Sequence, residues 1–240
     1  MVDLTNYMNV IFEKLNKKQG QDTINEKNID NKKRFKNILQ LVPENDKEKK
    51  EVATRIIELI VTKLNLTQAL NSIENLETNS EDRNIEVYGV FDKLLRSMNI
   101  KSLSSIKLKE EVPLSLSKVL MNPWNGRRVI SNLLNINSHK NNEFDPAKFP
   151  SNIQNYLLEP IGIILSEQGN HSQFSGASSG DRTTIITHKI DISELYSKVK
   201  FDGDNFIENE TKKTCNLPGV NKEIIFYTGV IFELGRILIV

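Results

Sequence analysis

The chain has 240 residues, of which 38% are hydrophobic and 26% charged, and its formal net charge is +1. This balance is typical of a globular protein, and the length allows roughly 70% of the unfolded chain's surface to be buried. It excludes disordered chains and histone-like polycations, whose nucleic-acid binding is evident from net charge alone. The single cysteine, Cys215, excludes an internal disulfide framework and a cysteine-based zinc site.

Two features of the sequence predict where the protein resides. No stretch approaches the ~18 apolar residues of a membrane-spanning helix. The first residues, MVDLTNYMNVIFEKLNKK, carry an acidic residue where a signal peptide has a basic region. We therefore expect a cytoplasmic protein that is neither secreted nor associated with a membrane.

The first hundred residues predict helices joined by polar connections. Apolar residues at helical spacing predict an amphipathic helix at the amino terminus: Leu4, Tyr7, Met8, Ile11 and Leu15. Further helices are expected from about Lys32 to Leu41, ended by Pro43, and from about Asp46 to Leu64. A short helix over 65–76 and a helix capped by Ser80 follow.

The segment from Lys101 to Pro123 predicts a linker with one short strand, because serines and prolines interrupt its pattern. Pro123 suits the first position of a helix that carries Trp124 and Val129. We therefore expect two regions, a helical region over 1–122 and an α/β region over 123–240.

The carboxy-terminal half has β-branched runs. Residues 157–168, LLEPIGIILSEQ, predict a buried strand, and residues 183–190, TTIITHKI, predict a second one. A short helix over 191–199, a turn over 201–206 and a helix from Asn221 to about Leu238 follow. The expected fold class is α+β, with a small mixed sheet from about Phe149 to Phe206 and a carboxy-terminal helix.

The residues Gly169, Asn170, His171 and Ser172 follow the first of these strands and precede a short predicted helix. A glycine turn at a helix start can present backbone N–H groups to an anion, and phosphate is the natural ligand. His171 can then donate to the phosphate or transfer a proton near neutral pH. The alternative is a purely structural turn in which Ser172 caps the helix.

Several segments around this turn resemble the ParB/sulfiredoxin-like fold, in which a helix, a Pro-Ile strand, a glycine turn, a helix and a strand follow in order. The matching pieces are FPSNIQNYLLE, PIGIILSE, GNHS and TTIITHKIDI. In that superfamily the turn binds nucleotide phosphates or takes part in DNA cleavage, so the resemblance implies phosphate contacts from Gly169, Asn170, His171 and Ser172. More broadly, NPWNGRRVISNLL, GNHS and IDISELYSKVKFDG resemble an uncharacterised group of bacterial and phage proteins.

The turn departs from the superfamily at three positions. Gln168 stands directly before the glycine, where nuclease-like members often have an acidic residue, and Glu167 comes one place earlier. Ser172 stands where ParB-type turns end in an arginine, so Arg128 or Arg182 is expected to supply the guanidinium, with Arg127 and Arg236 as further candidates. Asn170 stands where sulfiredoxin needs a cysteine, which argues against its thiol chemistry.

A metal site is not indicated by spacing, because His139, His171 and His188 match no compact ligand pattern. A site of His171, Glu167 and Asp191 can be drawn across the two predicted strands, but no metal ligand is assigned. The sequence does not identify a cofactor. A nucleotide with a divalent metal is the cofactor that the phosphate hypothesis suggests. A lone cysteine such as Cys215, without a placed base, is expected to be inert.

Three functions remain open. The first is a phosphate- or nucleotide-binding protein, a nuclease or a nucleotide-dependent switch acting on nucleic acid, in which His171 and Glu167 are catalytic and Gly169, Asn170, Ser172, Arg182 and Arg128 bind phosphate. The second is a non-enzymatic module whose amino-terminal helices bind a protein partner. The third is a nucleic-acid binder that uses Lys32, Lys33 and Arg34.

Overall fold

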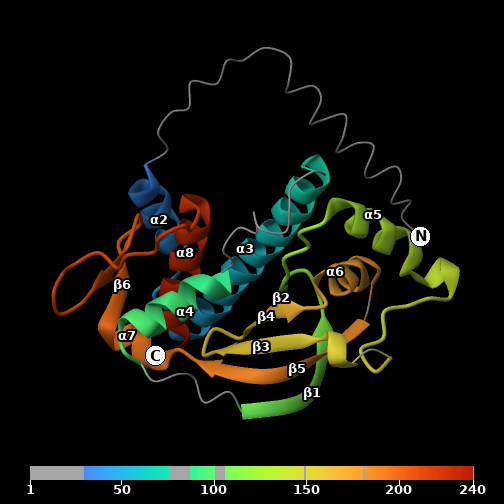
Figure 1. The fold of residues 1–240 in the computed structure, drawn as a ribbon. Helices are drawn as coiled ribbons and strands as arrows, with labels where there is room; N and C mark the ends of the chain where they lie inside the picture. Colours follow the sequence, from blue (N-terminus) through green and yellow to red (C-terminus); the bar gives the residue numbers. More distant parts are fainter. Residues whose placement is uncertain (1–29, 76–86, 101–105, 149, 181, 240) are drawn as a thin grey trace. The chain divides into compact units, whose positions relative to one another are not determined.

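Three helices precede the first strand in the described part of the chain: α2 (Asn31–Gln40), α3 (Asp46–Glu74) and α4 (Val87–Ser97). The structure is a computed structural model and describes residues 30–75, 87–100, 106–148, 150–180 and 182–239 (Figure 1). The helices predicted from about Lys32 to Leu41 and from about Asp46 to Leu64 are confirmed, as α2 and as the first part of α3. The amphipathic helix predicted near the amino terminus and the cap predicted at Ser80 lie outside the described residues.

Helix α3 is longer than expected. It runs without a break through the predicted boundary near Leu64, because no proline or glycine occurs between Asp46 and Glu74. Its inner face packs against α8, α5 and β2. The separate short helix predicted over 65–76 is therefore the last part of α3 as far as Glu74.

The main sheet has five strands in the order β1-β5-β3-β4-β2. Their bounds are β1 (Ile106–Leu114), β2 (Val119–Leu120), β3 (Gln154–Glu159), β4 (Ile163–Gln168) and β5 (Arg182–Asp191). The sheet is mixed, because β1 and β4 run antiparallel to their neighbours β5 and β3, whereas β3 pairs parallel with β5 and β2 parallel with β4. The predicted α+β class with a small mixed sheet is confirmed.

Three details of the strand predictions were wrong. The segment from Lys101 to Pro123 contains two strands, β1 and β2, instead of one in a linker. Residues 157–168 form the hairpin β3–β4 rather than one strand, because Pro160 has no N–H and Gly162 turns the chain at φ +81°. The helix that the ParB-like resemblance implies over 149–159 is a 3₁₀ turn (Pro150–Asn152) followed by β3.

Four of the remaining elements, the helices, follow the predicted order, whereas the short strands β6 and β7 were not predicted. The remaining elements are α5 (Gly126–Asn135), α6 (Asn170–Ser178), α7 (Ser193–Lys198), β6 (Val199–Phe201), β7 (Phe206–Glu208) and α8 (Lys222–Ile239). Strands β6 and β7 form a separate two-stranded sheet, and the turn predicted over 201–206 joins them. Helix α5 begins three residues later than expected, since Asn125 is its N-cap and accepts a hydrogen bond from the Arg128 N–H.

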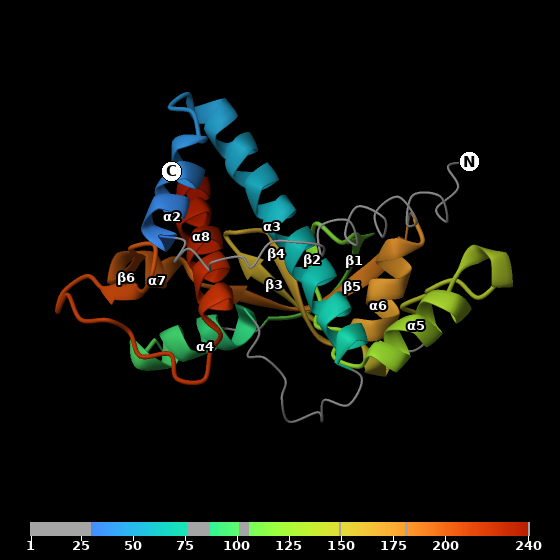
Figure 2. The same cartoon turned by 90° about the horizontal axis from the view of Figure 1, so that it is seen from above.

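Two hydrophobic clusters hold the layers together. On one face of the sheet, Phe174 of α6 packs with Ile164 and Ile186, and Ala69 of α3 joins this cluster. On the other face, Leu158 and other strand residues belong to a larger cluster with α3, α4 and α8. Figure 2 shows α5 and α6 side by side, next to the end of α3. This arrangement brings the starts of α5 and α6 close together.

Residues Asn31–Val240 form one compact unit. The predicted boundary between residues 122 and 123 stays a prediction, although β1 and β2 lie before it and pair with strands that lie after it. None of the helices in the described part of the chain combines the length and the apolar character needed to cross a membrane.

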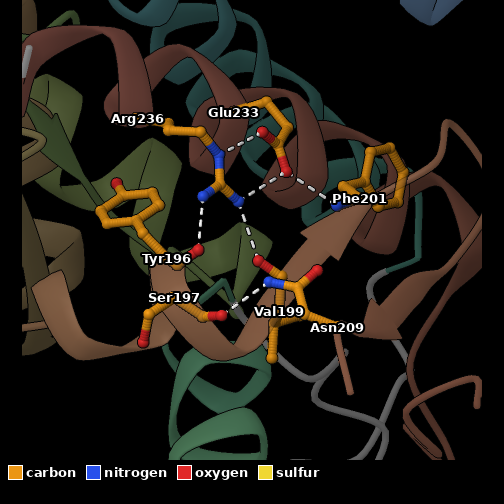
Figure 3. Close-up of polar contacts among 7 residues, drawn as sticks. All are labelled: Tyr196, Ser197, Val199, Phe201, Asn209, Glu233 and Arg236. Carbon is orange, nitrogen blue, oxygen red and sulfur yellow. Dashed lines mark hydrogen bonds and ion pairs between the residues drawn. The ribbon is translucent and has the colours of Figure 1, made fainter. Parts of the chain in front are cut away.

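A partly buried ion pair connects α8 to α7 and β6 (Figure 3). The Arg236 guanidinium binds Glu233 through Nε at 2.7 Å, and it also donates to the carbonyl oxygens of Tyr196 and Val199. Glu233 in turn accepts the Phe201 N–H at 2.7 Å. Arg236 is therefore occupied inside the fold, and it does not complete an anion site at Ser172.

The Tyr196 hydroxyl in this region is expected to lower the stability of the fold. It is buried, and it has no hydrogen-bond partner among the described residues. Burial raises the pKa of Tyr196 above its ordinary value, with the Arg236 charge opposing the shift. We expect Tyr196→Phe to raise the free energy of unfolding by about 1 kcal/mol, because an unsatisfied buried hydroxyl costs roughly 1–3 kcal/mol.

The stability gained in Tyr196→Phe is expected to increase at alkaline pH. Above the unfolded pKa of about 10, the unfolded tyrosine ionises while the folded one stays neutral, so the wild type loses stability and the phenylalanine variant lacks that loss. Urea unfolding at neutral pH and near pH ~10.5 measures both effects. Tyr227→Phe is the matched control, because the buried Tyr227 hydroxyl accepts from Arg34 at 3.1 Å and its removal is expected to destabilise. Equal signs for the two variants would contradict the assignment.

Candidate functional site

The turn between β4 and α6 depends on Gly169. This residue has φ +82°, and a Cβ built on it meets the Asn152 carbonyl oxygen at 2.7 Å. Helix α6 then begins at Asn170 without a side-chain cap on its first turn. The first amides of an α-helix have no acceptor within the helix, so this end carries a positive partial charge.

Asn170 fastens this helix start to the chain that leads into α5. Its side chain is buried, and its Oδ1 atom accepts the Asn122 N–H at 2.8 Å. The Nδ2 atom donates to the Glu167 carbonyl oxygen at 3.2 Å. The Asn170 side chain therefore positions the turn, and any contact of this residue with a ligand has to come from its main chain.

His171 joins the starts of the two helices. The imidazole is buried, its Nε2 atom accepts the Asn125 N–H at 3.0 Å, and its ring lies edge-on to Trp124 with centroids 5.4 Å apart. Nε2 accepts only when it carries no proton, so this bond needs the tautomer in which Nε2 is unprotonated. The histidine thus holds the N-cap of α5 against the first turn of α6.

The start of α5 adds positive charge to this junction. Arg127 and Arg128 are exposed, and the Arg128 guanidinium carbon lies 5.7 Å from the centroid of the half-buried Trp124 ring. Arg128 is the third residue of α5, three positions after Asn125, whose N–H His171 accepts. Of the two arginines expected to complete the site, Arg128 is the one that lies over a ring, Trp124, which also packs on His171 of the turn.

Ser172 faces a different space. Its hydroxyl donates to the Gly169 carbonyl oxygen at 3.1 Å. It also lines a cavity of about 320 Å³, together with Asn132, Asn152 and Lys148. Ser172 therefore lies at the edge of a cavity beside the first turn of α6, with its hydroxyl bound to the turn itself.

Arg182 lines a neighbouring cavity of about 390 Å³, which shares Glu143, Phe144, Asp145 and Lys148 with the first one. Its guanidinium forms an ion pair with Glu143 at 2.7 Å. The Arg182 guanidinium is therefore held by Glu143 in this cavity, which Ser172 does not line.

Glu167 is exposed near the end of β4. Its neighbour Ser166 faces α6, since it accepts from Gln173, so strand alternation places Glu167 on the opposite face. Asp191 pairs with Glu159, whereas Gln168 pairs with Gln154 at the other end of β3, about 17 Å away at ~3.3 Å per residue. The metal site drawn from His171, Glu167 and Asp191 was wrong for this reason. Within the described residues, no group of three or more His, Cys, Asp or Glu side chains is placed to hold a metal ion.

Three other residues considered as functional, Arg34, Lys32 and Cys215, interact with neighbours in the fold. Arg34 stacks on Phe226 at 4.1 Å and donates to Tyr227, which removes it from the basic surface considered for nucleic acid. The Lys32 ammonium lies within 4 Å of the carboxylates of the turn between β6 and β7. Burial, followed by the nearby charge of Glu208, raises the pKa of the Cys215 thiol, so this cysteine is a weak nucleophile.

The residues that support the site were missed in the sequence. Gln173 is fully buried and bonds Asn155, Ser166, Thr184 and the Gln168 carbonyl oxygen at 2.6–3.1 Å. This network fixes α6 on the sheet under the turn. Its only signal in the sequence is a set of amides and hydroxyls within strand and helix segments, which does not show that they meet.

Comparison with known proteins gives a family but no reaction. A family model described as "Family of unknown function (DUF6710)" matches residues 13–240. The chain belongs to the DUF6710 family. No curated protein and no solved structure matches this DUF6710 chain. What this member of DUF6710 does is therefore argued from its own residues.

Proposed function

We propose that this DUF6710 protein binds phosphate groups of a nucleotide or nucleic acid where α5 and α6 begin. The observation that carries the proposal is the hydrogen bond from the Asn125 N–H to His171 Nε2, which joins the two helix starts beside Arg128. Two helix N-termini and an exposed guanidinium give a positive potential that favours an anion. The half-buried Trp124 ring offers a flat apolar surface next to it.

The ParB-like resemblance supports the same place. The order β4, glycine turn, α6, β5 agrees with the order that the resemblance implies around a phosphate-binding turn. We include a ParB/sulfiredoxin-like relationship in the proposal on this basis, although β3 stands where that fold has a helix.

A nuclease or nucleotide-dependent switch would extend the proposal from binding to catalysis. His171 and Glu167 stay the predicted catalytic residues of that extension. For His171 to transfer a proton through Nε2, the bond from Asn125 has to break first. Binding alone needs no such change, so binding is the function that the geometry supports best.

Trp124 is the only tryptophan in the chain, so its fluorescence reports on the proposed site directly. Titration of the full chain with inorganic phosphate, a nucleoside triphosphate and a short single-stranded oligonucleotide is expected to change this emission and to saturate. Arg128→Ala is expected to weaken binding about 5- to 10-fold, since one lost phosphate contact costs roughly 1 kcal/mol at a solvated site. The comparison of the three ligands identifies the source of the phosphate.

Arg96→Ala is the control, because Arg96 is also an exposed helix arginine and pairs with Asp92 on α4. It is expected to leave the titration unchanged. No saturable response to any of the three ligands, or equal losses in the Arg128 and Arg96 variants, would disprove a phosphate site at the two helix starts.

A second candidate function is protein interaction through the amino-terminal helices. It is favoured by the exposed leucines Leu59, Leu66 and Leu70 on α3. Side chains of this kind are usually covered when they form a continuous surface. Binding of a partner that depends on these leucines and not on Arg128 tests this candidate.

A further inference from the structure

The outer face of α3 is apolar along its middle. At 3.6 residues per turn, positions 59, 63, 66 and 70 share one face. Leu59 is 70% exposed, Leu66 44% and Leu70 48%, whereas the buried residues Ile57, Val61 and Leu64 lie on the opposite side. We call the residues Leu59, Lys63, Leu66 and Leu70 the α3 stripe.

Lys63 does not interrupt the apolar surface of the α3 stripe. Its ammonium extends toward α8, where it lies 4.8 Å from the Tyr227 ring centroid and 3.9 Å from Glu223. The aliphatic stem of the lysine therefore remains between the leucines while the charge is held elsewhere. The stripe then offers apolar contacts over the length of three helical turns.

The charges at the two ends of the α3 stripe are opposite in sign, so they match when two copies of α3 lie antiparallel. Arg55 precedes Leu59 by four residues, and Glu74 follows Leu70 by four, so both continue the same face of the helix. When a second α3 runs antiparallel about a two-fold axis between residues 64 and 65, each Leu59 faces a Leu70 and each Arg55 faces a Glu74. Both Arg55 and Glu74 are exposed, and Arg55 is bound to Glu58 of its own helix at 2.8 Å.

We infer that the α3 stripe binds a second copy of this chain, with the two α3 helices antiparallel. The inference names the partner for the second candidate function and does not depend on phosphate binding. A two-fold pairing uses the same surface on both copies, so cation and anion match at both ends. From Arg55 to Glu74 the contact extends about 30 Å, which is small for an interface, so we expect a weak dimer.

Sedimentation equilibrium of the full chain from about 1 to about 100 µM tests the inference. We expect a monomer–dimer equilibrium whose dissociation constant rises at least about 10-fold in Leu59→Glu, since a carboxylate then faces Leu70 of the other copy. Leu41→Glu is the matched control, because Leu41 is also 70% exposed but lies outside the α3 stripe. This control is expected to dimerise like the wild type.

Charge reversal tests the antiparallel register. Arg55→Glu and Glu74→Arg alone are each expected to weaken the dimer about 5-fold, and the double variant is expected to restore it, because the swapped charges again face each other. Glu58→Gln controls for the loss of the ion pair within α3. The same series is run with Arg128→Ala, which is expected to dimerise normally.

Each other outcome overturns the inference. A monomer over the whole concentration range removes the second copy as the partner. A dimer that resists Leu59→Glu uses another surface, and failure of the double variant to recover excludes the antiparallel pairing. Binding of a different protein through the α3 stripe of a monomeric wild type would leave the second candidate function standing while disproving self-association.

Discussion

Gln173→Met is expected to lower the free energy of unfolding by about 4 kcal/mol, one of the two largest effects predicted for this protein. Methionine is similar in size but cannot hydrogen bond, so Asn155, Ser166 and Thr184 lose partners inside the fold. Each buried polar group left unsatisfied costs roughly 1–3 kcal/mol, and here several are affected at once. Urea unfolding followed by circular dichroism measures the loss.

Gln168→Met is the control for Gln173→Met. Gln168 is exposed at the end of β4, and the substitution is expected to change stability by less than about 0.5 kcal/mol. A loss of under ~1 kcal/mol in Gln173→Met would show that the network does not hold α6 on the sheet. Because the network lies beneath Gly169, Trp124 emission in the folded variant reports whether the site is also disturbed.

Asn65→Ala is expected to destabilise the protein by about 3–4 kcal/mol. Asn65 is fully buried on α3, and its Nδ2 atom donates to the carbonyl oxygens of Leu116 and Val119 at 2.8 Å. Its Oδ1 atom accepts the Met121 N–H at 2.7 Å. One side chain therefore satisfies three main-chain groups around the short strand β2, and alanine leaves all three without it.

Asn71→Ala provides the comparison on the same helix, since Asn71 is exposed and its replacement is expected to cost less than about 0.5 kcal/mol. An Asn65→Asp variant separates hydrogen bonding from packing. Its carboxylate faces two carbonyl oxygens at neutral pH, so we expect a loss at least as large as for alanine, which becomes smaller in acid as the carboxyl gains a proton. Equal stability of the Asn65 and Asn71 variants would contradict the role of Asn65.

The candidate site was only partly accessible to sequence reasoning. The glycine turn followed by a helix could be predicted at Gly169, because a polar stretch with glycine directly follows a buried run. The orientation of the His171 ring could not be predicted, because it depends on a hydrogen bond with Asn125, which lies 46 residues earlier in the chain. The choice between Arg128 and Arg182 likewise depends on Glu143, whose ion pair holds Arg182 in another cavity.

The sequence by itself determined the periodic elements of this protein. Apolar spacing specifies α2, α3 and α8, and β-branched content specifies β5, because these signals lie within one turn or one strand. Only the tertiary structure decided that β1 and β2 join the sheet and that β3 and β4 form a hairpin. It also decided that the side chains of Asn65, Gln173 and His171 form hydrogen bonds inside the fold. The physical reason is that a buried polar side chain is stabilised by partners distant in the chain, and a local pattern does not contain them.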